Sequence, residues 1–194
     1  MARKVTKASA PQKPLFDGFQ NAEHFYRADL QALNGSGITG TVFLAYDEDT
    51  GRLTVRVQAY GLEPNQIHIQ HIHGFGDGRD ATIPTLADDD ADGDGYLELA
   101  EGVPDYGPIL LNLTVDHASG AGGDNGHSHG ALEGFPTAPN GLIVFTQTYQ
   151  LPRDALLSGD DLDLNHIGIH GLSVPDGAGA GTGAEGRIGM TGAR

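Results

Sequence analysis

The feature that most limits the fold of this 194-residue chain is its division into short apolar segments separated by glycine-rich connections. The segment RLTVRVQAY, residues 52–60, alternates between apolar and polar residues, as a strand with one buried face does. No long amphipathic helical pattern occurs, and 30 glycines and 10 prolines are available for turns. The pattern predicts an all-β fold, either a sandwich or a barrel.

Strands are expected over residues 38–46, 52–60, 65–73, 108–115, 141–151 and 162–172. Residues 21–33 carry apolar residues near helical spacing and predict one short N-terminal helix, in which His24 is an ordinary member. Residues 1–18 are basic, polar and proline-containing, so we expect a disordered arm there. Residues 19–194 are then expected to form a single domain.

Charge and composition narrow the ligands that the chain can take. A net charge of -15 argues against nucleic acid, because binding to phosphates needs a basic surface. The absence of cysteine excludes disulfides and thiolate ligands, so imidazole and carboxylate groups must hold any transition metal.

Neither a signal peptide nor a membrane-spanning segment is expected from the sequence. Its first residues lack the apolar run of a signal peptide, and no segment has the length that spans a bilayer. We therefore expect a soluble protein with no membrane partner, cytoplasmic by default. A secreted form whose signal had been removed would look the same, so the compartment stays open.

The segment DADGDGYLELAE, residues 90–101, matches the twelve-position calcium loop. Asp90, Asp92 and Asp94 take the first, third and fifth positions, and Gly95 takes the sixth, where the chain must turn sharply. The remaining expected ligands are the carbonyl of Tyr96, the side chain of Glu98 and the bidentate carboxylate of Glu101. The pattern favours a calcium site over a solvated acidic turn.

The flanks of this loop are unlike those of paired EF-hands. Pro84 restricts the entering segment and Pro104 closely follows the loop, so neither flank is expected to form a full helix. A single loop in a β domain is predicted to be a structural staple that orders residues 74–107, rather than a sensor.

Three histidines occur within six residues of the segment NQIHIQHIHGFGDG. Alternation along a strand places His71 and His73 on one face and His68 on the other. A pair of neutral imidazoles on one face favours a bound transition metal, either copper or zinc.

Two further groups of histidines are candidate ligands. His166 and His170 lie four residues apart on one face of their expected strand. His117, His127 and His129 lie in the glycine-rich loop at residues 116–140, where a polar loop tip explains them as well as a metal site does.

His68, His71, His73, Phe75 and Asp77 fit the pattern H-x-x-H-x-H-x-F-G-D. The region around them resembles the first half of copper-zinc superoxide dismutase and of the related CHRD-type β-sandwiches. The resemblance implies a Greek-key β-sandwich or barrel of the superoxide dismutase type with long metal-ordered loops.

The resemblance also implies roles for individual residues. His71 and His73 would bind copper with His170 as the third ligand, and His68 would support the site from inside the barrel. The closing segment TGAEGRIGMTG is similar to the family's T-G-x-x-G-x-R-x-x-x-G, although it is one residue shorter. Arg187 would then be the arginine that guides a small anionic substrate.

The chain departs from this family between its two similar regions, about residues 36–78 and 141–192. The cysteines of the family disulfide are absent, and the calcium loop stands where zinc ligands are expected. Residues of suitable type with unmatched spacing are Asp116, His117, Asp124, His127 and His129. Copper and calcium are therefore the expected cofactors, and zinc is a further candidate.

Two functions follow from these patterns. The first is a copper-dependent oxidoreductase, most simply a superoxide dismutase, in which His166 or a loop histidine completes the copper shell. The alternative is a non-catalytic or differently catalytic sandwich of CHRD type that binds calcium together with copper or zinc. The expected partners are metal ions, a small anion such as superoxide, and a second copy of the chain in a homodimer.

Overall fold

The structure is a computed structural model that describes residues 19–115, 134–152, 161–172, 181–187 and 189–190. Within this part the chain is mostly β, as its alternating segments predict. The strands are β1 (His24–Ala32), β2 (Thr39–Asp47), β3 (Arg52–Tyr60), β4 (Gln70–His73), β5 (Ile109–Asn112), β6 (Leu142–Gln150), β7 (His166–Leu172), β8 (Gly181–Arg187) and β9 (Gly189–Met190). The helices are α1 (Leu86–Asp89), α2 (Leu99–Tyr106) and the 3-10 turns η2 (Pro139–Gly141) and η3 (Leu162–Leu164).

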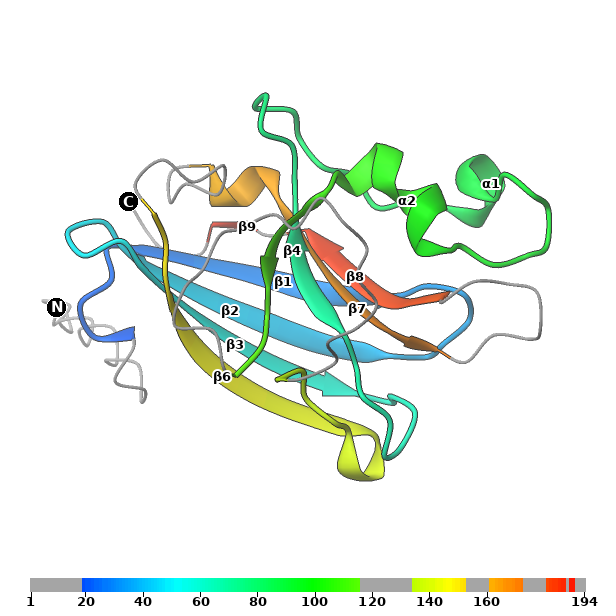
Figure 1. Ribbon diagram of the computed structural model, residues 1–194, viewed down its shortest axis with the longest axis horizontal. Coiled ribbons are helices and arrows are strands. Elements are labelled where there is room, and N and C mark those ends of the chain that lie inside the picture. The colour runs from blue at the N-terminus through cyan, green and yellow to red at the C-terminus, as the bar shows by residue number, and fades with distance from the viewer. Residues whose placement is uncertain (1–18, 116–133, 153–160, 173–180, 188, 191–194) are drawn as a thin grey trace, which may run out of the picture.

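The strands pair antiparallel in the order β5-β4-β7-β8-β1-β2-β3-β6, with β9 added beside β1. β1 belongs to two sheets, because it pairs with β2 along most of its length and with β8 at Gln31 and Ala32. The longer strands β1, β2, β3 and β6 lie side by side, while β4 and β5 cross in front of them (Figure 1). The two antiparallel sheets are thus joined through β1.

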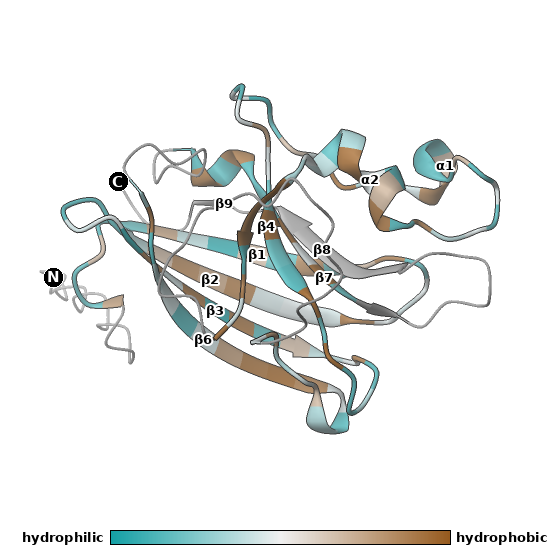
Figure 2. Ribbon diagram, in the orientation of Figure 1, coloured by the Kyte–Doolittle hydropathy of each residue, from teal (hydrophilic) through white to brown (hydrophobic). Residues whose placement is uncertain are grey.

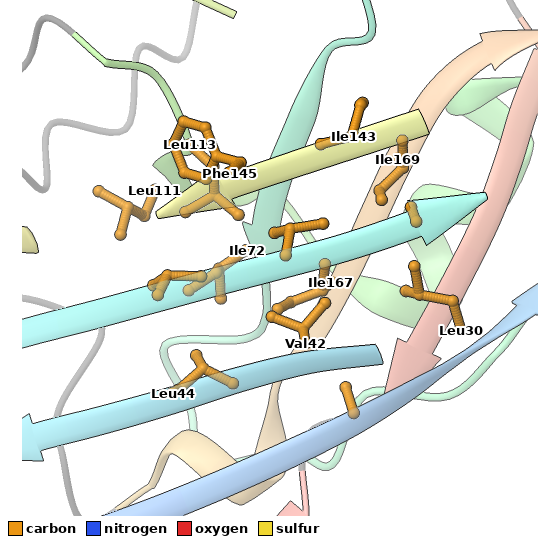
Figure 3. Close-up of a cluster of buried hydrophobic side chains, with 14 of the residues drawn as sticks. Leu30, Val42, Leu44, Ile72, Leu111, Leu113, Ile143, Phe145, Ile167 and Ile169 are labelled. Atoms are coloured by element: carbon orange, nitrogen blue, oxygen red, sulfur yellow. The ribbon is translucent and has the colours of Figure 1, made fainter. Parts of the chain in front are cut away.

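One hydrophobic core lies between the two sheets. The strand β3 follows the predicted alternation, since Leu53, Val55 and Val57 are all fully buried. Hydrophobic and hydrophilic residues follow one another along the longer strands (Figure 2). Ile72 from β4 and Ile167 from β7 belong to the same core cluster as these residues (Figure 3).

The predicted helix at residues 21–33 is wrong, because this segment forms β1. Tyr26, Ala28 and Leu30 are buried while the residues between them are exposed, which is the period of a strand. Hydrogen bonding to β2 along the strand outweighs the weak helical spacing. His24 consequently lies across from β2, where its Nε2 contacts the carboxylate of Glu48.

The prediction that neither flank of the acidic loop forms a full helix is wrong for the flank on the C-terminal side of the loop. α2 runs for eight residues and contains Pro104, whereas α1 on the entering side is a single turn. A capping box fixes the start of α2, since the backbone N–H of Glu98 donates to Oε2 of Glu101 over 3.1 Å.

Among the described residues, no helix has the length and apolar character that crossing a membrane requires.

Substitution of one buried and one exposed valine tests the hydrophobic core. We expect Val57→Ala to lower the free energy of unfolding by about 2 kcal/mol, because it removes two fully buried carbons and leaves a cavity. Val144→Ala on the same layer removes the same atoms from a side chain that is 57% exposed, and should change stability little. Urea unfolding measures both, and equal losses for the two variants would contradict this core.

Candidate metal centre

The pairing of β4 with β7 brings the predicted histidines together. His73 lies opposite His166, and His71 lies opposite Gly168, which has no side chain to fill the space between the strands. Ile72 and Ile167 take the core face of these strands, so the histidines project from the other face. That face is nevertheless closed to solvent, since His71 and His73 are 5% and 1% exposed.

Three imidazoles converge on that face. One ring nitrogen from each of His71, His73 and His170 lies within 4.8 Å of the others. The ring of His71 has its centroid 5.4 Å from that of His73 and 5.4 Å from that of His170. The rings approach one another edge-on or at tilted angles rather than stacked.

Each of the three rings has a buried nitrogen with no hydrogen-bond partner in the structure. These nitrogens are Nδ1 of His71, Nε2 of His73 and Nε2 of His170. Buried polar atoms are almost always hydrogen-bonded, so three orphaned nitrogens in one cluster need another explanation. A shared cation that accepts a lone pair from each of the three rings would explain them.

Neighbouring groups set the orientation of His73. Its Nδ1 donates to the carbonyl of Gly107 over 3.1 Å, which leaves Nε2 unprotonated in the neutral ring. Gly107 has a φ of 82°, and a Cβ there would lie 2.4 Å from the carbonyl oxygen of Gly74. A glycine at position 107 therefore allows the backbone to come close enough to hold His73.

His68 is fully buried and does not belong to the three-histidine cluster; it precedes β4, so the predicted alternation along a strand does not extend to it. Its Nδ1 lies 3.1 Å from the carbonyl oxygen of His170, and its Nε2 lies 3.0 Å from that of Glu63. A neutral ring can donate to one of these carbonyls at a time. Contact with the backbone of His170 makes His68 a support of that residue.

Burial keeps the three converging imidazoles neutral. Burial lowers the pKa of His71 to about 2, with the charges of His170 and His73 adding to the shift. It likewise lowers the pKa of His73 to about 3 and that of His170 to about 4. Unprotonated imidazole is the form that binds a metal, so the centre is ready for one at neutral pH.

Among the other predicted site residues, the structure describes His166 and the backbone of Arg187 but not the loop candidates. His166 is buried directly opposite His73 but does not belong to the three-histidine cluster. The backbone of Arg187 pairs with that of His166 in β8, next to the strand that carries His170. The loop candidates lie outside the described residues: Asp116, His117, Asp124, His127 and His129.

Two aromatic residues at the centre were not predicted. The ring of Tyr106 has its centroid 4.5 Å from that of His73, and the ring of Phe135 meets that of His71 edge-on at 5.7 Å. Neither residue belongs to a sequence pattern with histidine, so only their approach in space identifies them.

The acidic loop brings its predicted carboxylates together in two overlapping groups. Oxygens of Asp90, Asp92 and Asp94 lie within 4.8 Å of one another, as do those of Asp92, Glu98 and Glu101. Backbone N–H groups also point at these carboxylates, for example that of Tyr96 at Oδ1 of Asp94 over 2.9 Å. Hydrogen bonding from the backbone of Glu98 lowers the pKa of Glu101 and keeps that carboxylate charged.

Asn34, in the turn between β1 and β2, anchors this loop. Its Nδ2 donates to the carbonyl of Leu97 over 2.9 Å, and its Oδ1 accepts from the N–H of Leu97 over 2.7 Å. Leu97, at the eighth loop position, is itself buried. A side-chain amide thus satisfies both backbone groups at the middle of the loop.

Comparison with known proteins finds no family model and no curated protein that matches this chain. The geometry of the two clusters therefore carries the functional argument.

The lowered pKa values of the histidines predict that acid destabilises the metal-free protein. In the unfolded chain an imidazole has a pKa of about 6.5, so it takes up a proton before the buried rings do. As the pH falls from about 6.5 toward about 4, the free energy of unfolding should drop by about 1.4 kcal/mol per pH unit for each ring that stays neutral.

Urea midpoints of metal-free protein between pH 7 and pH 5 measure this slope. The variant His24→Ala should retain it, because His24 lies outside the cluster on β1. A midpoint that stays constant over this range would show that the rings are not held neutral.

Proposed function

We propose that this chain binds copper through His71, His73 and His170 and is a metal-dependent oxidoreductase of superoxide dismutase type. The observation that carries the proposal is the convergence of three buried imidazoles, with one nitrogen of each within 4.8 Å of the others and an unpartnered buried nitrogen on each ring. A copper ion bound there would supply one-electron redox chemistry. The protein would hold it with three neutral nitrogens and shield it from bulk water.

The chemistry of the donors favours copper or zinc over other ions. Imidazole suits both of these metals, and at equal geometry the affinity order places copper above zinc. Calcium and magnesium prefer oxygen ligands, and the three-histidine cluster contains no carboxylate. Three protein ligands also leave a further position for a small molecule, as metal centres that react with substrates require.

We also propose that the fold is the Greek-key sandwich of the superoxide dismutase type. The two antiparallel sheets and the placement of the histidines on β4 and β7 support it. In that fold Arg187, whose backbone lies beside His166, would guide a small anion such as superoxide to the centre.

A second candidate is a metal-binding sandwich of CHRD type with no redox activity. Two observations favour it: the net charge of -15 repels an anionic substrate, and His71, His73 and His170 are all buried. A structural metal site would need a fourth protein ligand in addition to these three, and zinc would serve such a site as well as copper.

The acidic loop at residues 90–101 would hold calcium in either case. The match at each ligand position of the twelve-residue pattern supports the proposal, as does the grouping of the carboxylates around Asp92. Since Glu98 and Glu101 begin α2, an ion bound there would fix the start of that helix.

Metal analysis tests the histidine centre. Protein made without a histidine tag should retain about one equivalent of copper after dialysis, and zinc should compete for the same site. His71→Ala and His170→Gln should weaken copper binding by more than about 100-fold, because each removes a ligand. The control His24→Ala should bind copper as the wild type does.

A superoxide assay on the copper-loaded protein then separates the two candidates. Activity that His71→Ala abolishes supports the oxidoreductase, whereas bound copper or zinc without activity supports the second candidate. Failure of wild-type protein to retain either metal, or unchanged binding by both ligand variants, would refute the centre itself.

Thermal melting tests the calcium site. Calcium added to metal-free protein should raise the midpoint by about 5–10 °C at saturation, because the ion binds the folded chain alone. Asp92→Asn should abolish this rise, since Asp92 belongs to both carboxylate groups. Asp49→Asn, in the turn between β2 and β3, removes an equal charge and should leave the rise intact.

An equal rise in wild type and Asp92→Asn would show that calcium acts elsewhere. A midpoint that calcium does not move in the wild type would refute the site.

A further inference from the structure

The last residue of α2 and the C-cap residue that follows it both contact one candidate ligand. Tyr106 places its ring centroid 4.5 Å from that of His73, with the two planes at 56°. Gly107 accepts a hydrogen bond from Nδ1 of the same imidazole over 3.1 Å. The ring of His73 is thus contacted by the ring of Tyr106 and held at Nδ1 by the carbonyl of Gly107.

Tyr106 is itself fixed along the length of α2. Its hydroxyl donates to the carbonyl of Leu99, in the first turn, over 2.7 Å. Gly102 makes this path possible, because a Cβ at that position would lie 2.2 Å from the tyrosine ring. The ring therefore lies flat against the helix, anchored at the hydroxyl and fully buried.

We propose that Tyr106 is a positioning residue of the metal centre, which acts through His73. By holding that imidazole against the Gly107 carbonyl, it keeps Nδ1 protonated and leaves Nε2, which has no hydrogen-bond partner, available for an ion shared with His71 and His170. The inference rests on the proposed copper centre for its consequence, but the orientation of His73 is a property of the metal-free chain as well.

The chain offers a matched control for a buried tyrosine. Tyr149 on β6 is also fully buried, and its hydroxyl also donates to a backbone carbonyl, that of Thr114 over 3.0 Å. β6 ends the sheet order opposite to β4 and β5, so Tyr149 belongs to the other layer of the sandwich. Loss of Tyr149 should cost stability without changing the metal centre.

The first experiment is NMR of the histidine side chains in metal-free protein labelled with nitrogen-15. In the wild type, His73 should appear as the Nδ1-protonated form alone. Tyr106→Leu should produce a mixture of the two tautomers, whereas Tyr106→Phe, which keeps the ring, should stay close to wild type. Tyr149→Leu should leave the His73 signals unchanged.

The second experiment measures copper affinity by chelator competition and the paramagnetic resonance spectrum of bound copper. Tyr106→Leu should bind copper about 10–100-fold more weakly, with an altered hyperfine splitting, and Tyr106→Phe should restore most of both. Tyr149→Leu should match the wild type in affinity and spectrum.

The outcomes are distinguishable. Wild-type protein that binds no copper refutes the proposed function, while the tautomers of His73 still decide the role of Tyr106. A single Nδ1-protonated form in Tyr106→Leu, or equal effects from Tyr106→Leu and Tyr149→Leu, would overturn the inference.

Discussion

Antiparallel pairing of β4 with β7 is the constraint on which the rest of the centre depends. The pairing sets His73 across from His166 and Gly168 across from His71, so one face of the sheet carries imidazoles and the other carries the core isoleucines. The same backbone hydrogen bonds therefore build the core and the candidate centre. A shift of one residue in register would exchange the two faces, placing imidazole in the core and isoleucine at the centre.

A strand could be predicted correctly where its segment carries a single strong sequence pattern. Strict alternation predicts β3, in which Leu53, Val55, Val57 and Ala59 are all buried. The segment of β1 carries two weak patterns, and the helical one was preferred because the ladder to β2 cannot be seen in the sequence. β8 was not expected at all, since GTGAEGR contains no alternating apolar residues and owes its conformation to the strands on either side.

The site could be predicted in part for the same reason. Residue type and spacing predict the pair His71 and His73, the family resemblance adds His170 as the third ligand, and the structure brings these three together. The groups that orient them come from elsewhere in the chain and carry no local pattern. Tyr106 belongs to no sequence pattern with histidine, and Gly107 contacts His73 through its backbone carbonyl rather than through a side chain. Such contacts depend on how α2 packs over the sheet, and this packing follows from the whole fold.

The amide of Asn34 has a consequence for the order in which the chain folds. It bonds both backbone groups of Leu97, a residue 63 positions away in sequence. This anchor exists only after the hairpin of β1 and β2 has formed its turn, and long-range contacts of this kind form slowly. The anchored conformation of the acidic loop therefore requires that the turn of the first hairpin be in place.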